Sequence, residues 1–537
     1  MANVFKKVID RMMWDQVAPS PNAHAAAAGL AVDMRSDVSR NPFVYQLVNA
    51  TVLNRFNIVT KAWNFVQSPA LAGTYAAGAA VAFVPSFGAV GTIAAGATTK
   101  KVTLSTALPT AVGLNMLANR GGSGDYGFKL RITDTTAGKT EERYIVGNTA
   151  GTAPAIDLLS DFSFTPATGA RYELLAGRVF MLGAGTTASN IWRSLEIATN
   201  TLSTGLSTTN LPATVATDSD IMVLDEQYTP YDNKPGEGMI KGAFTYDTGL
   251  VSRNALAATA IGASTLTGQA SGGDAVVAAN EYRNFQIRIV QDLTNPTAVG
   301  QRRVIASHTA GVSPVYTLGT AWAVNPSATA KYVIELPNLI LMRSSATTSV
   351  YTYNYMDATI NNGTNSIATN SWSTTYFGVA QAANVLSGRW APSFGIQPDI
   401  SRNARHSFCY FFRGASATLD VLDIAGAIAG TWTGAITYDG AVTLTTGTSG
   451  AYAPYGNEGR MFYMNIYTAS ALNQIFRFDV KNRVLSPYTP TDFIQAGTAA
   501  TGNRMTAYAA LDGTDVYDCV LMQSHLSTLA QELIPLV

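Results

Sequence analysis

The segment FDVKNRVLS, residues 478–486, has a form that recurs along the chain. FNIVTKAWN at 56–64, LEIATNTLS at 195–203 and SIATNSWS at 366–373 share its frame, in which Ile or Val is followed five positions later by Trp or Leu and then by Ser or Asn. YDTGLVS at 246–252 and LDIAGAIAGTWT at 422–433 are looser versions. Because polar turn residues reverse the chain and the Trp or Leu packs back onto the sheet, the pattern predicts a repeated strand, turn and strand.

The spacing of these turns indicates a propeller. Ile367, Ile424 and Val480 are 57 and 56 residues apart, and the longer intervals reduce to about 40–50 residues once an inserted module of about 90 residues is removed. The turns resemble those of kelch-like β-propellers, whose blades carry an aromatic-Asp-x-x-x-x-x-Trp sequence, although the paired glycines of kelch blades are not regular here. This resemblance implies an all-β, kelch-like propeller of six to seven blades, with DVYDCVLMQSHLSTL at 515–529 as a seventh blade or closing strand.

Two inserted β modules interrupt this pattern. TPATGARYELLAG at 165–177 and NPSATAKYVIELP at 325–337 belong to a longer alignment that keeps an offset of 160 residues. The aligned pairs are Arg143/Arg303, Thr149/Thr309, Gly151/Gly311, Pro154/Pro314, Phe162/Trp322, Pro166/Pro326 and Tyr172/Tyr332. We expect both modules to leave after an outer turn, to lie in blade-to-blade connections and to project from the same face. Tyr172 and Tyr332 are expected to be equivalent packing residues.

The sequence therefore divides into six segments. FKKVIDRMM, residues 5–13, has apolar residues at helical spacing and predicts a short amphipathic helix in a preceding arm. The predicted segments are an N-terminal arm at 1–50, propeller at 51–84, module 1 at 85–177, propeller at 178–255, module 2 at 256–336 and the remaining propeller blades with their closure at 337–537.

The composition excludes several classes of function. Only 13% of the residues are charged, and Lys+Arg and Asp+Glu both total 35, so no strong field would gather nucleic acid or anionic lipid. Cys409 and Cys519 lie in apolar runs typical of buried, inert thiols. The charged N-terminus lacks the apolar stretch of a secretory signal. Residues 67–99 carry no charge, but their prolines and glycines argue against a membrane-spanning helix.

No catalytic, cofactor-binding or metal-binding residue is predicted, and no interaction residue is identified. The four histidines are not at a spacing typical of a metal motif and are interpreted as structural, with His308 a surface residue in the place of Asn148. A loop at 216–238 is rich in carboxylates that could bind calcium or flank a glycosidic bond, but solvated loop charge is the favoured interpretation. Its acidic residues are Asp218, Asp220, Asp225, Glu226, Asp232 and Glu237.

The module sequences carry a second resemblance. The pattern R-x-I-x-x-x-T-x-G-x-x-P at 143–154 and 303–314, with GTIAAGATTKKVTLSTALP at 91–109, is similar to β modules of tailed-bacteriophage virion proteins. This implies a structural protein of the phage tail, closest to the hub or nozzle proteins of short-tailed phages, and no enzyme. The resemblance further implies a homo-oligomeric ring, with sixfold symmetry favoured, whose partners are adaptor, portal or fibre proteins. DNA would pass through it without specific binding. Neither membrane insertion nor a cofactor is expected. The expected location is the virion tail, after synthesis in the host cytoplasm.

Two alternatives stay open. The first is a receptor-binding, collar, baseplate or capsid appendage protein that uses a propeller face to bind host glycan. The second is a glycan hydrolase or lyase that uses Asp225 and Glu226 of the acidic loop.

Overall fold

The computed structural model is built of β-strands, and its only helical element among the described residues is the single turn η2, Pro296–Ala298. It describes residues 14–16, 18–21, 29–32, 43–49, 52–58, 60–65, 75, 79–84, 88–118, 128–183, 191–203, 205–211, 215, 220–224, 239–241, 255–270, 278–343, 349–378, 394–395, 408–413, 416–437, 439, 449–453, 461–466, 474–479, 482–488, 504–509, 519–524 and 530–533.

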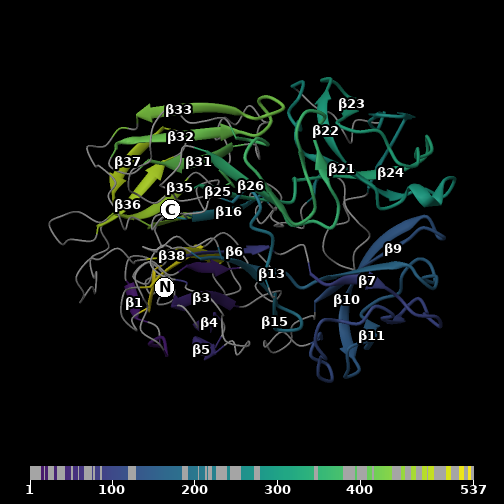
Figure 1. Cartoon of the computed structure of the whole chain (residues 1–537), viewed down its shortest axis with the longest axis horizontal. Coiled ribbons are helices and arrows are strands. Elements are labelled where there is room, and N and C mark those ends of the chain that lie inside the picture. The colour runs from purple at the N-terminus through teal and green to yellow at the C-terminus, as the bar shows by residue number, and fades with distance from the viewer. Residues whose placement is uncertain are drawn as a thin grey trace, which may run out of the picture.

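Five four-stranded antiparallel sheets follow the order of the chain as the blades of a β-propeller-like arrangement (Figure 1). Blade 1 contains β2 (Leu30–Val32), β3 (Phe43–Asn49), β4 (Val52–Asn57) and β5 (Ala62–Phe65). Blade 2 contains β6 (Ala80–Val84), β13 (Arg178–Leu182), β14 (Trp192–Glu196) and β15 (Thr201–Leu202). Blade 3 contains β16 (Asp220–Leu224), β25 (Leu339–Arg343), β26 (Val350–Asn354) and β29 (Ser371–Ser373). Blade 4 contains β30 (Phe394–Gly395), β31 (Phe408–Phe412), β32 (Thr418–Asp423) and β33 (Thr431–Thr437). Blade 5 contains β34 (Ser449–Ala453), β35 (Met461–Ile466), β36 (Gln474–Asp479) and β37 (Val484–Pro487).

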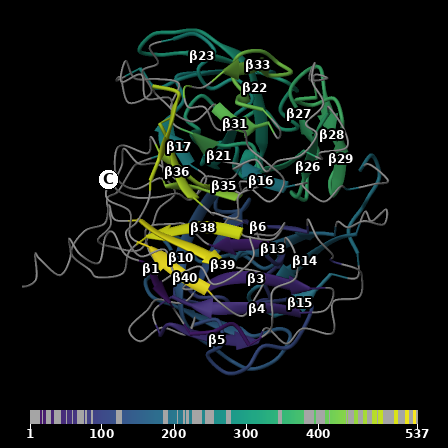
Figure 2. The same ribbon diagram turned by 90° about the vertical axis from the view of Figure 1, so that its left-hand side faces the viewer.

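A sixth four-stranded sheet joins the two ends of the chain and is called the composite sheet below. It contains β38 (Arg504–Ala509), β39 (Cys519–Ser524), β40 (Ala530–Leu533) and, paired with β40, the N-terminal strand β1 (Trp14–Gln16) (Figure 2). Strand β38 contacts β2 of blade 1 and β34 of blade 5. The described residues therefore show five blades, and the prediction of six to seven blades is not supported.

The prediction of a helical N-terminal arm at 1–50 is wrong for the part that the structure describes. Residues 14–16 form β1, and residues 30–32 and 43–49 form two strands of blade 1. The helix predicted at 5–13 lies outside the described residues. Strand pairing with distant segments, which a local periodicity does not reveal, decides the conformation here.

The position of the two insertions also differs from the prediction. The first strands of the blades, β2, β6 and β16, contact one another in succession and are the inner strands, whereas β13 and β25 are second in their sheets. Module 1 lies between β6 and β13, and module 2 between β16 and β25. Each insertion therefore occupies the same connection inside a blade, not a connection between blades.

The modules themselves form one continuous sheet of 14 strands. Module 1 supplies β7 (Val90–Thr92), β8 (Lys101–Thr103), β9 (Lys129–Asp134), β10 (Lys139–Asn148), β11 (Ala155–Leu158) and β12 (Arg171–Leu175). Module 2 supplies β18 (Leu256–Ala257), β19 (Ala260–Gly262), β20 (Thr265–Thr267), β21 (Gln286–Gln291), β22 (Arg302–His308), β23 (Val315–Leu318) and β24 (Lys331–Glu335). Strand β17 (Met239–Lys241), from the segment predicted as propeller, pairs with β24. The modules lie side by side on one side of the blades (Figure 1) and meet where Lys139 pairs with Gln291. Module 2 also bonds to blade 4, where Arg283 donates to Gly426 O at 2.7 Å.

The repeated turns owe their shape to one left-handed residue. Lys61, Asn200, Asn370 and Arg483 occupy the same position of the four sequence repeats, and their φ angles are 54°, 51°, 54° and 55°. In blades 1 and 5 the residue at the end of the preceding strand accepts a turn N–H: Asn57 from Thr60 at 3.0 Å and Asp479 from Asn482 at 3.1 Å. Such side-chain acceptors stabilise a tight reversal. In blade 3 an extra hairpin, β27 (Ile360–Asn361) and β28 (Ser366–Ile367), lengthens the turn.

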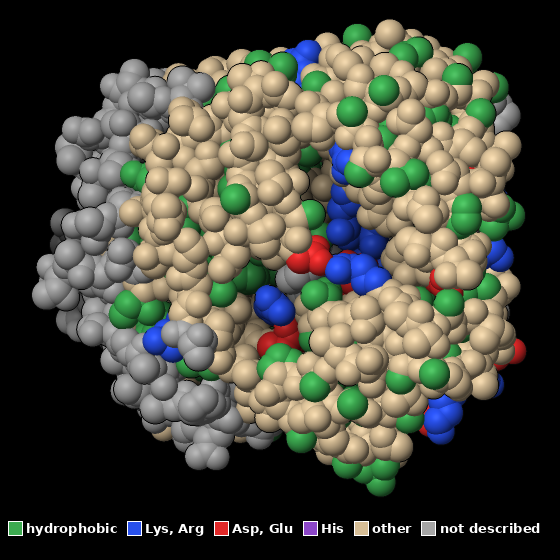
Figure 3. Space-filling view, turned by 45° about the vertical axis from the view of Figure 1, so that its right-hand side comes forward, with side chains coloured by type: hydrophobic (Ala, Val, Ile, Leu, Met, Phe, Trp, Pro, Cys, Tyr) green, Lys and Arg blue, Asp and Glu red, His purple; other side chains and the backbone are tan. Residues whose placement is uncertain are grey.

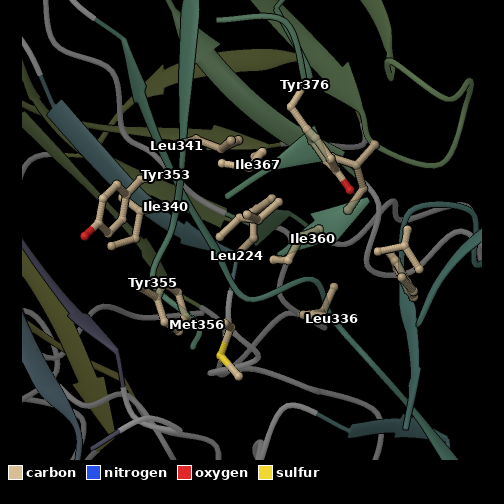
Figure 4. Close-up of a cluster of buried hydrophobic side chains, with 14 of the residues drawn as sticks. Leu224, Leu336, Ile340, Leu341, Tyr353, Tyr355, Met356, Ile360, Ile367 and Tyr376 are labelled. Carbon is tan, nitrogen blue, oxygen red and sulfur yellow. The ribbon is translucent and has the colours of Figure 1, made fainter. Parts of the chain in front are cut away.

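Aromatic side chains fill the space between neighbouring blades. Trp192 of blade 2 lies 5.1 Å from Trp372 of blade 3, measured between ring centroids, and Tyr353 lies 5.0 Å from Trp372. Around them, side chains of β16, β25, β26 and the β27–β28 hairpin form the core seen in Figure 4. The burial of such large apolar surfaces is the main stabilising contribution to the fold.

Candidate functional site

The repeated arginines of the modules, Arg143 and Arg303, each support a loop, and Arg303 also lines the cavity described below. Arg143 Nε donates to Asp161 O at 2.9 Å, and its guanidinium lies 5.0 Å from the ring centroid of Phe162. Arg303 Nε donates to Ala321 O at 2.7 Å and lies 5.6 Å from the ring centroid of Trp322. The two repeats therefore build the same packing unit.

A buried aspartate explains why the segments TPATG and NPSAT recur. Asp134 accepts from Thr136 N at 2.7 Å, Ala137 N at 3.0 Å and Ala167 N at 2.7 Å. In module 2, Asp292 makes the equivalent bonds to the hairpin and accepts from Ser327 N at 2.6 Å. Each carboxylate thus joins a hairpin turn to the loop before the last strand of its module, and charge-assisted bonds of this kind are comparatively strong.

His308 and Asn148 have the same structural task, so the interpretation of His308 as a surface residue is wrong. His308 is 4% exposed, and its Nε2 accepts from Tyr282 N at 2.8 Å while Nδ1 lies 2.9 Å from Thr309 O. Asn148 Oδ1 accepts from Leu117 N at 2.8 Å, and its Nδ2 donates to Thr149 O at 2.8 Å. Both side chains satisfy a backbone N–H from a preceding loop.

This equivalence gives a direct prediction. The variant H308A leaves the buried Tyr282 N–H without its acceptor and is expected to lose about 1–3 kcal/mol of unfolding free energy. H308N, which copies module 1, should lose less than half as much. Urea denaturation of the two variants measures the difference. Equal losses of unfolding free energy in H308N and H308A would contradict the idea that His308 and Asn148 are equivalent acceptors for a backbone N–H.

The candidate functional site lies at the seam where the modules meet, and Glu173 is its centre. Glu173 Oε2 lies 2.7 Å from Arg288 Nη2 and 3.2 Å from Arg131 Nη1. Its Oε1 lies 3.4 Å from Arg171 Nη2 and 3.5 Å from Arg302 Nη2. Two of these arginines come from each module, so a single carboxylate holds the two insertions together.

Further carboxylates surround this centre. Glu142 contacts Arg131 and Lys129, Glu335 lies between Arg288 and Arg302, and Asp357 lies 2.6 Å from Arg171 Nη2. Asp357 belongs to the connection between β26 and β27, so it ties module 1 to blade 3. The seam therefore connects three parts of the chain that are far apart in sequence.

The pKa values at the seam follow from this geometry. Burial alone would raise the pKa of Glu173, but the four arginines hold it well below its usual range. Burial, with like-charge repulsion from Arg302 as the next cause, lowers the pKa of Arg288 to about 10. Glu173 is therefore ionised, and the repulsion between Arg288 and Arg302 is only partly compensated.

A cavity of about 460 Å³ opens at this seam. Its wall combines module 1, module 2 and the β26–β27 connection, and it includes four arginines with Asp357 as the only carboxylate among the residues that line it. Figure 3 shows Lys, Arg, Asp and Glu side chains gathered in this hollow, while the surrounding surface carries few charges. The volume is in the range typical of small-molecule sites.

The residues considered from sequence do not meet in this cavity. Asp220 lies in β16, and Asp218, Asp225, Glu226, Asp232 and Glu237 lie outside the described residues, as do His24, His406 and His525. No group of His, Cys, Asp and Glu among the described residues could hold a metal ion.

Cys409 is fully buried, which raises the pKa of its thiol. The described part of the chain contains no helix that is long and apolar enough to cross a membrane.

Sequence reasoning missed the seam because the two modules differ there. Glu173 and Glu335 align with Val333 and Leu175, and Arg302 aligns with Glu142, so the repeat comparison does not select them. A usable signal was nevertheless present. Single charged residues inside apolar strands, as in KLRIT and QIRIV, indicate buried ion pairs because isolated buried charges are costly.

Comparisons with known proteins do not assign a family. No protein-family model matches the sequence, and no curated protein does. Matches among solved structures include Sqt1 from Saccharomyces cerevisiae, at 8% identity with a TM-score of 0.33, covering 98% of this chain and 100% of that one. A putative phosphatase from Bacteroides thetaiotaomicron matches at 9% identity with a TM-score of 0.25, covering 85% and 99%. The NanB sialidase from Streptococcus pneumoniae matches at 10% identity with a TM-score of 0.24, covering 82% and 81%. Similarities of this size carry no argument about activity.

Proposed function

We propose that this protein is a structural component of a bacteriophage tail, a hub- or nozzle-type ring protein whose two modules contact neighbouring tail proteins or fibres. One observation supports this proposal above all: among the residues whose side-chain exposure the structure describes, every large apolar side chain that is exposed lies on a module. These side chains are Leu114, Met116, Val146, Leu293, Val312 and Val315. Exposed apolar groups that gather on one part of a surface are typical of interaction sites.

Most of these residues lie at equivalent ends of the modules. In module 1, Leu114 and Met116 flank Asn115, whose N–H donates to Asn148 O at the end of β10, close to Val146. In module 2, Val312 and Val315 lie in and beside the β22–β23 hairpin, which corresponds to the β10–β11 hairpin. The shared position supports a contact role for this end of both modules.

The proposal includes a closed ring of blades within each subunit. In this proposal the composite sheet serves as a sixth blade, and the contacts of its strand β38 with both β2 and β34 support that role. A formal net charge of zero supports the passage of DNA along a channel without adhesion. Imaging of intact particles tests the assignment. A sixfold ring at the tail vertex is expected, and a monomer in the virion or absence of the protein from the tail would overturn it.

Variants at the module ends test the contact role. L114S, M116S and V312S change exposed positions and should alter the unfolding free energy by less than about 0.5 kcal/mol each. Their combination is nevertheless expected to reduce incorporation into particles. Thr152 occupies the place of Val312 in module 1 and is exposed, so T152S is a matched control that should assemble normally. Normal incorporation of the triple variant, measured as protein per particle, would contradict the contact role.

A further inference from the structure

The seam cavity holds more positive than negative charge. Among the described residues, the ion-pair network around Glu173 has five cationic side chains and four carboxylates, so the cations outnumber the carboxylates by one. The cations are Lys129, Arg131, Arg171, Arg288 and Arg302, and the carboxylates are Glu142, Glu173, Glu335 and Asp357. Of these groups, Arg171, Arg288, Arg302 and Asp357 line the cavity, so its wall carries more positive than negative charge among the described residues.

Arg302 contacts its two carboxylates only over long distances. Its Nη2 lies 3.5 Å from Glu173 Oε1 and its Nε lies 3.6 Å from Glu335 Oε1, and both carboxylates are shared with other arginines. Within the part of the chain that the structure describes, the buried Nε of Arg302 makes no hydrogen bond, and neither does Glu335 Oε1. Arg302 lines the cavity together with Arg171, whose side chain is 36% exposed and is held by Asp357. An incoming anion can therefore reach both guanidinium groups.

We propose that this cavity binds a small, hydroxyl-rich ligand that carries an oxyanion, either carboxylate or phosphate, with Arg302 and Arg171 as the binding cations. Planar guanidinium groups bind both oxyanions with two parallel hydrogen bonds. A bound oxyanion neutralises the positive surplus and replaces the long contacts of Arg302 with short ones. Sugar acids and sugar phosphates share this chemistry.

The rest of the cavity wall fits the hydroxylated part of such a ligand. Thr135 of module 1 and Thr359 and Asn361 of the β26–β27 connection line the cavity and carry hydroxyl and amide groups. Gln301 of module 2 also lines it, but its side-chain amide bonds to the backbone of Ala323 and Val324. Hydroxyl and amide groups can both donate and accept hydrogen bonds, as sugar hydroxyls require. Because the wall comes from three parts of the chain, the bound ligand would contact both modules and blade 3.

Calorimetric titration of the full chain tests the proposal with four probes: glucuronate, glucose 6-phosphate, inorganic phosphate and uncharged glucose. Glucuronate and glucose 6-phosphate should bind, and glucose should not. R302Q is expected to weaken binding of both acids about 10- to 100-fold, since a hydrogen bond to a charged group is lost. D357N should strengthen binding several-fold, because it removes the carboxylate that competes for Arg171.

K101Q is the control variant. Lys101 is half-exposed on module 1, where it pairs with Asp157 and does not line the cavity, so this change alters net charge without changing the site. Unchanged affinity in K101Q and tighter binding in D357N would exclude both a general charge effect and damage to the fold. Absence of binding by both acids, or equal binding of glucose, would overturn the proposal. Binding of inorganic phosphate alone would overturn the assignment of a hydroxylated ligand.

Discussion

Replacement of Glu173 by Gln is expected to lower the free energy of unfolding by about 3–5 kcal/mol, because it leaves four buried or half-buried arginines without their shared carboxylate. Two of these arginines belong to each module, so the loss should weaken the contact between the modules. Urea denaturation combined with hydrogen exchange at the amides of β12 measures both effects. A loss below about 1 kcal/mol would mean that Glu173 does not hold the seam together.

The pH dependence of stability provides an independent readout of Glu173. Its folded-state pKa lies well below the usual 4.5, so its contribution is complete above pH 4.5 and is lost as the pH falls through the folded value. The difference in stability between the wild type and E173Q should therefore shrink on acidification. Burial raises the pKa of Glu196, so this residue makes stability fall as the pH rises. Because it is present in both proteins, its effect cancels in their difference. D357N, at a partly exposed pair, should cost about 0–1 kcal/mol and serves as the control.

Replacement of Trp372 by Ala is expected to cost about 3–5 kcal/mol, since a large side chain is removed from a packed core. Trp372 is 1% exposed and joins blade 3 to Trp192 of blade 2. The turn repeat supplies a matched control, because Trp63 occupies the same position in blade 1 but is partly exposed; its ring contacts Phe56, and its Nε1 donates to Ala18 O at 2.6 Å. W63A should cost only about 1–2 kcal/mol. Equal losses in thermal or urea denaturation would contradict an interblade role of Trp372.

Local sequence was a good guide where a local cause determines the structure. The turn repeat predicted a reversal between strands, and the structure has a left-handed residue at the same repeat position in Lys61, Asn200, Asn370 and Arg483. The offset of 160 residues likewise corresponds to equivalent strands, and Tyr172 and Tyr332 are both fully buried opposite Ile132 and Ile289. Turn geometry and strand alternation depend on residues that are neighbours in the chain, so both can be predicted from the sequence alone.

Long-range pairing was not predictable in the same way. The inner strand of blade 3, DIMVL, is followed by more than 100 residues before its partner LILMR, and no local feature links the two. The N-terminal residues 14–16 likewise pair with residues 531–533. Strand partners are chosen by the face that each strand can bury, which depends on the whole fold.

The sequence by itself determined the all-β class, the repeated turns and the two similar modules, because alternation and turn chemistry act over a few residues. Only the tertiary structure decided that the N-terminal strand belongs to the composite sheet and that both modules occupy equivalent connections inside neighbouring blades. It also brought Glu173 together with arginines from 42 residues before it to 129 residues after it. A buried charge is tolerated only where distant partners surround it, so the seam exists only in the folded chain.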